Sequence, residues 1–323
     1  MLTLNLIKEA CTSLNGKVRV TPVEESPVLS EHLGVPVWLK LENLQVTGSF
    51  KARGALFSLI KCRERGQQHV ATCSAGNHGR GLAWASQQTG VRVTIFVPSG
   101  VDATKFDAMQ RMGADVRKSA FFGYDETEAW AQSEAESMGI PFVSAYDDDF
   151  VMAANGGMIA DEVHRQLPEA REFVMPVGGG GHAGGFAFYM KSVLPDSRII
   201  ACQHADSAGF LRSVEAGEPI LELPPIRTLA SGLEGGFGIK TYDVLKDRYD
   251  DIRLVNEEEL RRAMRWMMEH HQMIVEGSSA VTIAALLHPD FPKPTAPLVA
   301  FLSGRNVAFE TVREVMNEDD LTS

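Results

Sequence analysis

The chain has 323 residues, of which 44% are hydrophobic, so it can bury a large core and could hold one large domain or two moderate ones. Its 31 Lys and Arg are outnumbered by 42 Asp and Glu, and the net charge of -11 gives no long-range attraction to nucleic acid or an anionic membrane. These properties favour a protein that acts on a small molecule.

The N-terminal segment 1–22 is a short amphipathic pattern that lacks the apolar block of a secretory signal. No later run approaches the ~18 apolar residues that a membrane-spanning helix needs. The four cysteines are scattered without C-x-x-C spacing, which argues against a zinc ribbon and against a disulfide scaffold. We therefore expect reduced thiols and a cytoplasmic protein.

From residue 35 onward, short β-rich runs alternate with helical patterns, which is typical of an α/β fold with a parallel sheet. The predicted strands are 35–43, 69–75, 91–98, 141–146, 172–179, 198–205 and 297–304. Helices are expected between them, for example at 103–113 and 257–271. No linker rich in Pro, Gly and Ser divides the chain, so a second domain would have to be inserted.

Three glycine-containing turns each follow a predicted strand and precede a helix. They are SAGNHG (74–79), GGGGHAGG (178–185) and SGRN (303–306). Ligands of parallel α/β sheets bind beyond the carboxyl ends of the strands, where free N–H groups and helix dipoles attract anions. The sequence therefore predicts one site for a ligand with several anionic groups. The turn-rich segment 224–238 either serves this site or is a plain connection.

The run Gly178–Gly181 lets the backbone approach a ligand closely, as phosphate binding requires. It lacks the Lys-Ser/Thr of a P-loop and the acidic residue that accompanies a dinucleotide-binding turn. On the residues alone, a phosphate cradle and a tight turn are equally open.

Lys51 lies in LENLQVTGSFKARGA (41–55), where Gly48 and Gly54 flank the start of a helical pattern. A single lysine is usually a solvated surface group. Here small neighbours leave room for a planar ring beside the amine, and a Schiff-base lysine needs a partly desolvated pocket. Lys51 is therefore a candidate for binding a cofactor through its amine.

In this order and at this spacing, TGSFKARGA, SAGNHG, GGGG and SG-x-N resemble the threonine/serine dehydratase family of fold-type II pyridoxal-phosphate enzymes. The resemblance implies pyridoxal 5′-phosphate as cofactor and a two-domain α/β fold with parallel-rich twisted sheets flanked by helices. It implies a large cofactor-binding domain (1–52 plus 149–323) and a small inserted domain (53–148) that closes on the substrate. It also implies a homo-oligomer, a dimer or larger.

The resemblance also implies roles for individual residues. Lys51 would bind the cofactor as a Schiff base and then take the Cα proton of the substrate. Phe50 would contact the cofactor, or only pack in the core. Ser303 would hydrogen-bond the ring nitrogen of the cofactor. The residues expected to hold the cofactor phosphate are Gly178, Gly179, Gly180 and Gly181.

Five consecutive residues match the loop that binds the substrate carboxylate in this family. They are Ser74, Ala75, Gly76, Asn77 and His78. Asn77 would also reach the 3′ oxygen of the cofactor and bind it, whereas His78 would contribute its main chain. Ser74 either only hydrogen-bonds the carboxylate or also moves a proton on the face opposite Lys51, as in enzymes that racemise serine.

Ser303 bears on the type of reaction. A neutral hydroxyl leaves the ring nitrogen largely unprotonated and favours β-elimination over transamination. We therefore predict a lyase that dehydrates and deaminates a small β-hydroxy amino acid such as threonine or serine, giving a 2-oxo acid and ammonia. An amino-acid racemase and a pyridoxal-phosphate-binding or amino-acid-sensing protein without turnover are the alternatives.

Two departures from the family concern the substrate. Arg305 in SGRN and the GGFG at 235–238 resemble the branch of hydroxyectoine-utilisation dehydratases. A hydroxyectoine-derived substrate or hydroxyaspartate is therefore a further alternative. The Arg305 side chain could equally point outward to a surface carboxylate.

Three further positions leave their roles open. His182 stands where an apolar residue is usual, so it adds either a donor near the phosphate or none. Glu276 matches a family glutamate near the cofactor pocket, or it is a charge at a helix N-terminus. Gln203 stands where some relatives have a metal-binding glutamate, so we expect no metal site.

Overall fold

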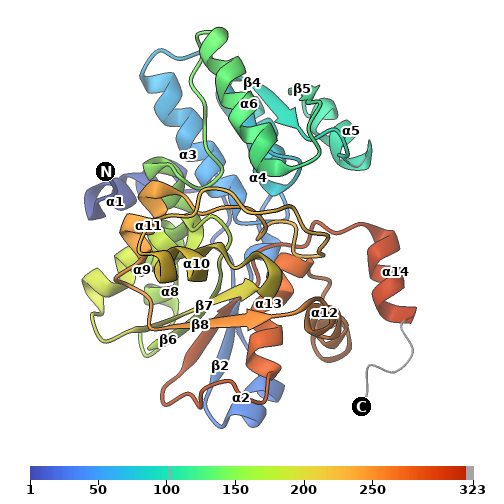
Figure 1. Ribbon diagram of the computed structural model, residues 1–323. Helices are drawn as coiled ribbons and strands as arrows, with labels where there is room; N and C mark the ends of the chain where they lie inside the picture. The colour runs from blue at the N-terminus through green and yellow to red at the C-terminus, as the bar shows by residue number, and fades with distance from the viewer. Residues whose placement is uncertain (102, 318–323) are drawn as a thin grey trace.

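The computed structural model describes residues 1–101 and 103–317 (Figure 1). Within these residues the strands form two sheets, one with the order β1-β2-β9-β6-β7-β8 and one with the order β3-β4-β5. All neighbouring strands are parallel except β1 and β2. The strands are β1 Val23–Glu25, β2 Val37–Lys40, β3 His69–Cys73, β4 Arg92–Val97, β5 Asp115–Lys118, β6 Glu172–Pro176, β7 Arg198–His204, β8 Asp251–Val255 and β9 Leu298–Phe301.

Helices flank both sheets, and the three-stranded sheet with α5 and α6 forms the upper part of the molecule in Figure 1. The α-helices are α1 Leu4–Leu14, α2 Pro27–Leu33, α3 Lys51–Glu64, α4 Asn77–Thr89, α5 Ala103–Arg111, α6 Tyr124–Ser137, α7 Asp149–Met152, α8 Met158–Gln166, α9 Gly181–Val193, α10 Gly209–Ala216, α11 Ile239–Leu245, α12 Glu257–His271, α13 Gly277–Leu287 and α14 Phe309–Asn317. Short η1 Glu42–Leu44 and η3 Ala205–Ser207 are 3-10 turns, and η2 Ala153–Gly157 is a π-helical turn between α7 and α8.

The inner strands of the six-stranded sheet bury apolar side chains on both faces, as expected for parallel strands covered by helices. Along β6, Phe173 and Met175 join the core that contains residues of α8 to α11. Val174, between them, joins the core formed with α12 and α13. This alternation explains why β6 is a continuous apolar run, and it confirms the predicted α/β fold with parallel-rich sheets.

One predicted strand, 141–146, is wrong. This segment lies beside β3 and exchanges two hydrogen bonds with Ala71, one from Ala71 N to Pro141 O and one from Val143 N to Ala71 O, each 2.8 Å. Its pairing ends there in a single bridge. Pro141 has no N–H to donate, and after Val143 the chain bends toward Lys51 instead of continuing beside the sheet.

Three strands have no counterpart in the prediction: β1, β5 and β8. Each of them lies at the edge of its sheet. An edge strand is half exposed and tolerates polar residues, so its sequence lacks the apolar run that marks an inner strand. The other predicted strands, and the helices at 103–113 and 257–271, match observed elements within a few residues.

The three-stranded sheet spans residues 69–118, inside the segment 53–148 expected for the inserted domain. The domain limits themselves stay a prediction. The segment 217–238 contains neither helix nor strand and runs between the two sheets, from α10 to α11 (Figure 1). None of the described helices is long and apolar enough to cross a membrane. All four cysteines are free thiols.

Candidate active site

Lys51 is the first residue of α3 and lies beside the turn that follows β9. Phe50 N donates to Ser303 O at 3.1 Å, and Arg305 N donates to Gly48 O at 2.9 Å. Gly48 has a φ of +80°, and a β-carbon there would lie 2.7 Å from the Asn306 side chain, so the close approach of the two segments requires glycine. This pairing brings together two regions that are 250 residues apart in the sequence.

The Lys51 amine donates a hydrogen bond to Ala145 O at 2.7 Å. Burial lowers the pKa of Lys51 to about 8, although the negative charges of Glu128 and Glu276 act in the opposite direction. A substantial fraction of the amine is therefore neutral near pH 7.5, which is the form that attacks an aldehyde carbon.

A buried ion network anchors the first turn of α3. The Arg53 guanidinium is fully buried and binds Glu42 at 2.7 Å and Glu162 at 2.6 Å. Lys40 Nζ binds the second oxygen of Glu162 at 2.8 Å. Because Lys40 belongs to β2, Glu42 to η1 and Glu162 to α8, Lys51 stands two residues from a charge network that joins four elements, α3 included.

The four glycines Gly178–Gly181 form the turn between β6 and α9, as the sequence predicts. Gly180 has a φ of +90°, and a β-carbon there would lie 2.3 Å from the Phe237 ring. A β-carbon at Gly179 would lie 2.4 Å from Tyr146 Cγ. Side chains are thus excluded, and the turn ends at the N-terminus of a 13-residue helix, where N–H groups without helical partners attract an anion.

The SAGNHG loop connects β3 to the N-terminus of α4. Ser74 is buried, and its Oγ accepts a hydrogen bond from Gly76 N at 3.2 Å. Ala75 is partly buried, whereas Gly76 is exposed and a β-carbon there would contact nothing within 4 Å. His78 is buried, and burial, helped by the charge of Lys51, lowers its pKa to about 3, so its ring is neutral at neutral pH.

Asn77 joins this loop to the far side of the site. Its Nδ2 donates to Glu276 Oε1 at 2.7 Å, and its Oδ1 accepts from Asn306 Nδ2 at 2.6 Å. Arg80 Nη1 in turn donates to Asn306 Oδ1. Both ends of the Asn77 amide are therefore engaged by protein, and its expected contact with a cofactor oxygen stays a prediction.

Glu276 is buried, and it is also the residue that precedes α13. Its position therefore fits both alternatives from the sequence, a glutamate near the cofactor pocket and a charge at a helix N-terminus. Burial raises its pKa to about 7, because the hydrogen bonds from Asn77 and from Asn306 N only partly offset the loss of solvation. Near neutral pH this carboxyl exists in both protonation states.

Ser303 lies two residues after the end of β9 and is 3% exposed, whereas the side chain of Arg305 is exposed. His182, the second residue of α9, stacks on Phe50 with ring centroids 4.5 Å apart. Both ring nitrogens of His182 are buried without a hydrogen-bond partner. Burial lowers the pKa of His182 to about 3, so its ring is neutral at neutral pH.

Gln203 has a structural role in this fold. Its Nε2 donates to Val177 O at 3.2 Å, and its Oε1 accepts from Leu211 N at 3.0 Å. The long segment 217–238 lies against the glycine turn, since a β-carbon at Gly178 would lie 2.8 Å from Gly232 O. That contact favours a role for the segment in the site over a plain connection.

Sequence reasoning did not single out Tyr124, Glu128 and Tyr146, which contact one another. The two tyrosine hydroxyls donate to the Glu128 carboxylate at 3.2 and 3.3 Å. Only the four-residue spacing of Tyr124 and Glu128, which predicts neighbours on one helix face, was visible in the sequence.

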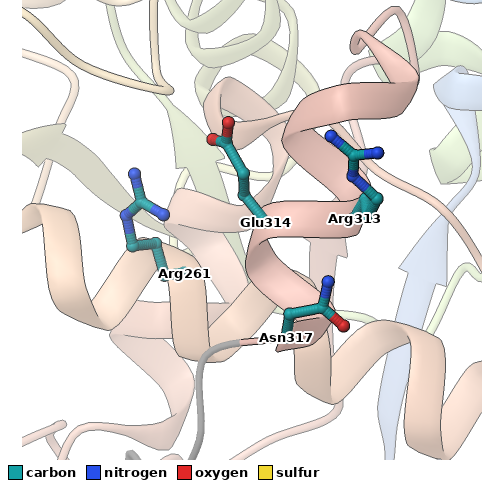
Figure 2. Close-up of a pocket in the computed structure, with 4 residues that line it drawn as sticks. All are labelled: Arg261, Arg313, Glu314 and Asn317. Carbon is teal, nitrogen blue, oxygen red and sulfur yellow. The ribbon is translucent and has the colours of Figure 1, made fainter.

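A separate surface pocket lies between α12 and α14 (Figure 2). Its lining residues are Arg261, Arg313, Glu314 and Asn317. It contains none of the predicted site residues. The site around Lys51 combines an amine of lowered pKa, a glycine turn at a helix N-terminus and a buried neutral hydroxyl, and this set of groups fits pyridoxal phosphate.

Comparison with known proteins supports that fit. The family model described as pyridoxal-phosphate dependent enzyme matches residues 14–304. The L-threonine ammonia-lyase of Geobacter sulfurreducens is 37% identical over 318 residues, which cover 98% of this chain and 78% of that protein.

Solved structures of a threonine deaminase and a serine racemase have the same fold as this chain. The processed form of threonine deaminase isoform 2 from Solanum lycopersicum superposes with a TM-score of 0.87 at 30% identity, over 97% of this chain and 92% of that chain. The serine racemase of Dictyostelium discoideum superposes with a TM-score of 0.87 at 31% identity, over 95% of this chain and 99% of that chain.

Proposed function

Since the chain belongs to the family of pyridoxal-phosphate-dependent enzymes, we propose that it is an ammonia-lyase that dehydrates and deaminates threonine or serine. The predicted family, cofactor and enzyme class are confirmed by the family match and by relatives named threonine ammonia-lyase. The identity of the amino acid is the part that rests on relatives alone.

The observation that carries the choice of elimination is the position of Ser303. Its carbonyl accepts the hydrogen bond of Phe50 N, so it stands beside the cofactor lysine, and its side chain is a neutral hydroxyl. When bound, pyridoxal phosphate supplies an electron-withdrawing ring that acidifies the Cα–H bond of an attached amino acid. A hydroxyl partner at the ring nitrogen favours elimination over transamination.

The residues of the chain divide the remaining work. Lys51 would take the Cα proton, because its amine has a lowered pKa and is oriented by Ala145 O. The exposed backbone at Gly76 and the N-terminus of α4 would bind the substrate carboxylate. The turn Gly178–Gly181 would bind the phosphate, and Phe50 would contact the ring.

Racemisation is a second candidate, supported by the likeness to serine racemase. It needs a proton donor on the face opposite Lys51. Ser74 Oγ accepts from Gly76 N, which leaves the hydroxyl hydrogen of Ser74 available for donation. We place elimination first because relatives named threonine ammonia-lyase match with higher identity.

The test is an assay of the purified, cofactor-loaded protein with threonine, serine, hydroxyaspartate and a hydroxyectoine-derived hydroxy amino acid. The proposal expects a 2-oxo acid and ammonia in equal amounts, with threonine or serine turned over fastest. Remaining substrate is analysed on a chiral column. Inversion without 2-oxo acid would establish a racemase instead, and cofactor absorption without any turnover would indicate a binding protein.

We also propose, from the family resemblance, that the protein is a cytoplasmic homo-oligomer. Sedimentation equilibrium of the loaded protein tests the assembly, and a monomer at micromolar concentration would contradict it. Fractionation of cells tests the compartment.

A further inference from the structure

Glu128 is a partly buried carboxylate held by two phenols. Tyr124 Oη donates to Glu128 Oε1 at 3.2 Å, and Tyr146 Oη donates to Glu128 Oε2 at 3.3 Å. Tyr124 lies one turn earlier on α6, whereas Tyr146 comes from the segment between α6 and α7. Both oxygens of the carboxyl group are thus fixed by side chains from two parts of the chain.

Tyr124 fixes Glu128 near the loop expected to bind the substrate carboxylate. Its hydroxyl lies 3.4 Å from Cys73 O, at the residue directly before Ser74. The hydroxyl oxygen of Tyr124 therefore lies close both to the end of β3 and to the Glu128 carboxyl group.

Tyr146 fixes Glu128 near the other two parts of the site. Its ring covers Gly179, where a β-carbon would lie 2.4 Å from the ring. It directly follows Ala145, whose carbonyl accepts the hydrogen bond of the Lys51 amine. Through these two phenols Glu128 is thus linked to the end of β3, to the turn Gly178–Gly181 and to the residue that follows the hydrogen-bond acceptor of Lys51.

The surroundings of Glu128 favour a carboxyl group that keeps its proton. Burial raises its pKa to about 7, the two phenol hydrogen bonds lower it, and the charges of Asp125 and Asp147 raise it. Among the described residues no Lys or Arg forms an ion pair with it. Burial also raises the pKa of both tyrosines well above 10, so they remain neutral donors.

We propose that Glu128 is the general acid that protonates the leaving β-hydroxyl group of the substrate. This inference rests on the proposed dehydratase function. Tyr124 and Tyr146 hold the carboxyl group one side chain away from the elements expected to anchor the substrate, and a neutral acid beside a hydroxyl group supplies the proton that this poor leaving group requires.

The step balances in atoms and electrons. The Cβ–O bond breaks and its electron pair stays with oxygen, which takes the Glu128 proton and leaves as water. The proton on Cα goes to Lys51, and the electron pair of that C–H bond becomes the second bond between Cα and Cβ. The Glu128 carboxylate stays held by Tyr124 and Tyr146 and regains a proton from solvent before the next turnover.

The test compares two substrates that differ in their leaving group, L-serine and β-chloro-L-alanine. Chloride leaves without a proton, whereas hydroxide needs one. Glu128→Gln keeps the size of the side chain and a hydrogen-bond acceptor but cannot supply the proton. In the loaded enzyme we expect its kcat with L-serine to fall on the order of 100-fold and its kcat with β-chloro-L-alanine to change less than about threefold.

A control variant and the pH dependence of the two rates give further tests. Glu126→Gln, an exposed residue on the same helix, should leave both rates unchanged. The parent should lose activity with L-serine at alkaline pH as Glu128 loses its proton. That loss should be absent with β-chloro-L-alanine, which needs Lys51 but not Glu128.

Two outcomes would overturn the proposal. One is an equal fall in kcat with the two substrates in Glu128→Gln, since this would mean that Glu128 only positions Lys51 or the cofactor. An unchanged rate with L-serine would overturn it as well. If the parent itself makes no pyruvate from L-serine, no 2-oxobutyrate from L-threonine and no pyruvate from β-chloro-L-alanine, the proposed lyase function fails instead.

The visible absorption of the bound cofactor measures loading independently of turnover. Glu128→Gln should load as the parent does. If it fails to load, Glu128→Asp takes its place, because it keeps a proton donor on a shorter side chain. We expect this variant to lose activity with L-serine selectively, and a loss of the same size with β-chloro-L-alanine would count against the proposal.

Discussion

Asn77 Nδ2 donates a hydrogen bond to Glu276 Oε1 across 2.7 Å, which joins the first residue of α4 to the residue that precedes α13. The two helices flank different sheets. Asn306 completes the contact, because its backbone N–H donates to Glu276 Oε2 at 3.1 Å. A contact between the two halves of the site therefore depends on a carboxyl group whose pKa is raised to about 7 by burial.

This shift predicts how stability depends on pH. Between the ordinary pKa of 4.5 and about 7, the folded protein holds the Glu276 proton and the unfolded chain does not, so stability falls as pH rises. Glu276→Gln should remove this dependence, whose slope is at most about 1.4 kcal/mol per pH unit. Urea unfolding from pH 5 to pH 8 measures it. Glu310→Gln, on the exposed surface of α14, serves as control, and identical slopes in all three proteins would refute the assignment.

Lys51→Ala should abolish both the visible absorption of the cofactor and the release of ammonia, because the amine is the proposed attachment point and the proposed base. Lys61→Ala is the matched control on the same helix. Lys61 pairs with Glu9 and Glu64 at the surface, so its loss should leave absorption and turnover unchanged. Turnover by Lys51→Ala at near the parent rate would end the proposed mechanism.

Ser303→Asp should shift the reaction away from elimination. A carboxylate at this buried position would hold a proton on the ring nitrogen and favour transamination. The ratio of ammonia to pyridoxamine phosphate measures the change, and we expect it to fall about tenfold, equivalent to about 1.4 kcal/mol. Ser303→Ala, which removes the hydroxyl without adding charge, should keep the ratio. The same ratio in all three proteins would contradict the electronic argument.

A comparison of Gly180→Ala with Gly90→Ala separates the cost of a positive φ from the cost of a steric clash of the added β-carbon. Both glycines have a positive φ, +90° and +75°, but a β-carbon at Gly180 would lie 2.3 Å from Phe237 and one at Gly90 meets nothing within 4 Å. We expect Gly90→Ala to cost about 1 kcal/mol and Gly180→Ala about 3 kcal/mol or more of the free energy of unfolding. Cofactor affinity should fall only in Gly180→Ala. Equal effects on stability would show that the turn can open.

The inner strands could be predicted from the sequence because each is apolar on both faces. In β6, for example, Phe173 and Val174 contact different cores, so both must be hydrophobic. The edge strands β1, β5 and β8 were missed because exposure on one side lets polar and charged residues interrupt their apolar pattern. The segment 141–146 was predicted as a strand because its residues are mostly apolar. It lies beside β3, but it bends away, and Ala145 O accepts the hydrogen bond of the Lys51 amine.

The site divides in a similar way. Lys51 and the glycine turns could be singled out because each lies in a local sequence motif, and their roles stay predictions. Glu128 depends on Tyr146, 18 residues further along the chain and in no regular element, so its position follows from tertiary packing alone. Protein packing alone explains why residue 179 is glycine, since the Tyr146 ring leaves no room for a side chain there. A glycine run can thus reflect protein packing as much as ligand binding.

The buried network of Arg53 with Glu42 and Glu162 holds the start of the helix that carries Lys51, the proposed cofactor lysine. Removing one partner of such a network leaves an uncompensated buried charge and costs about 3–5 kcal/mol, so the first turn of α3 resists displacement. In the proposed mechanism the base would then keep its place in the fold. Segments outside this network, such as 217–238, would be the ones free to differ between enzymes that act on different substrates.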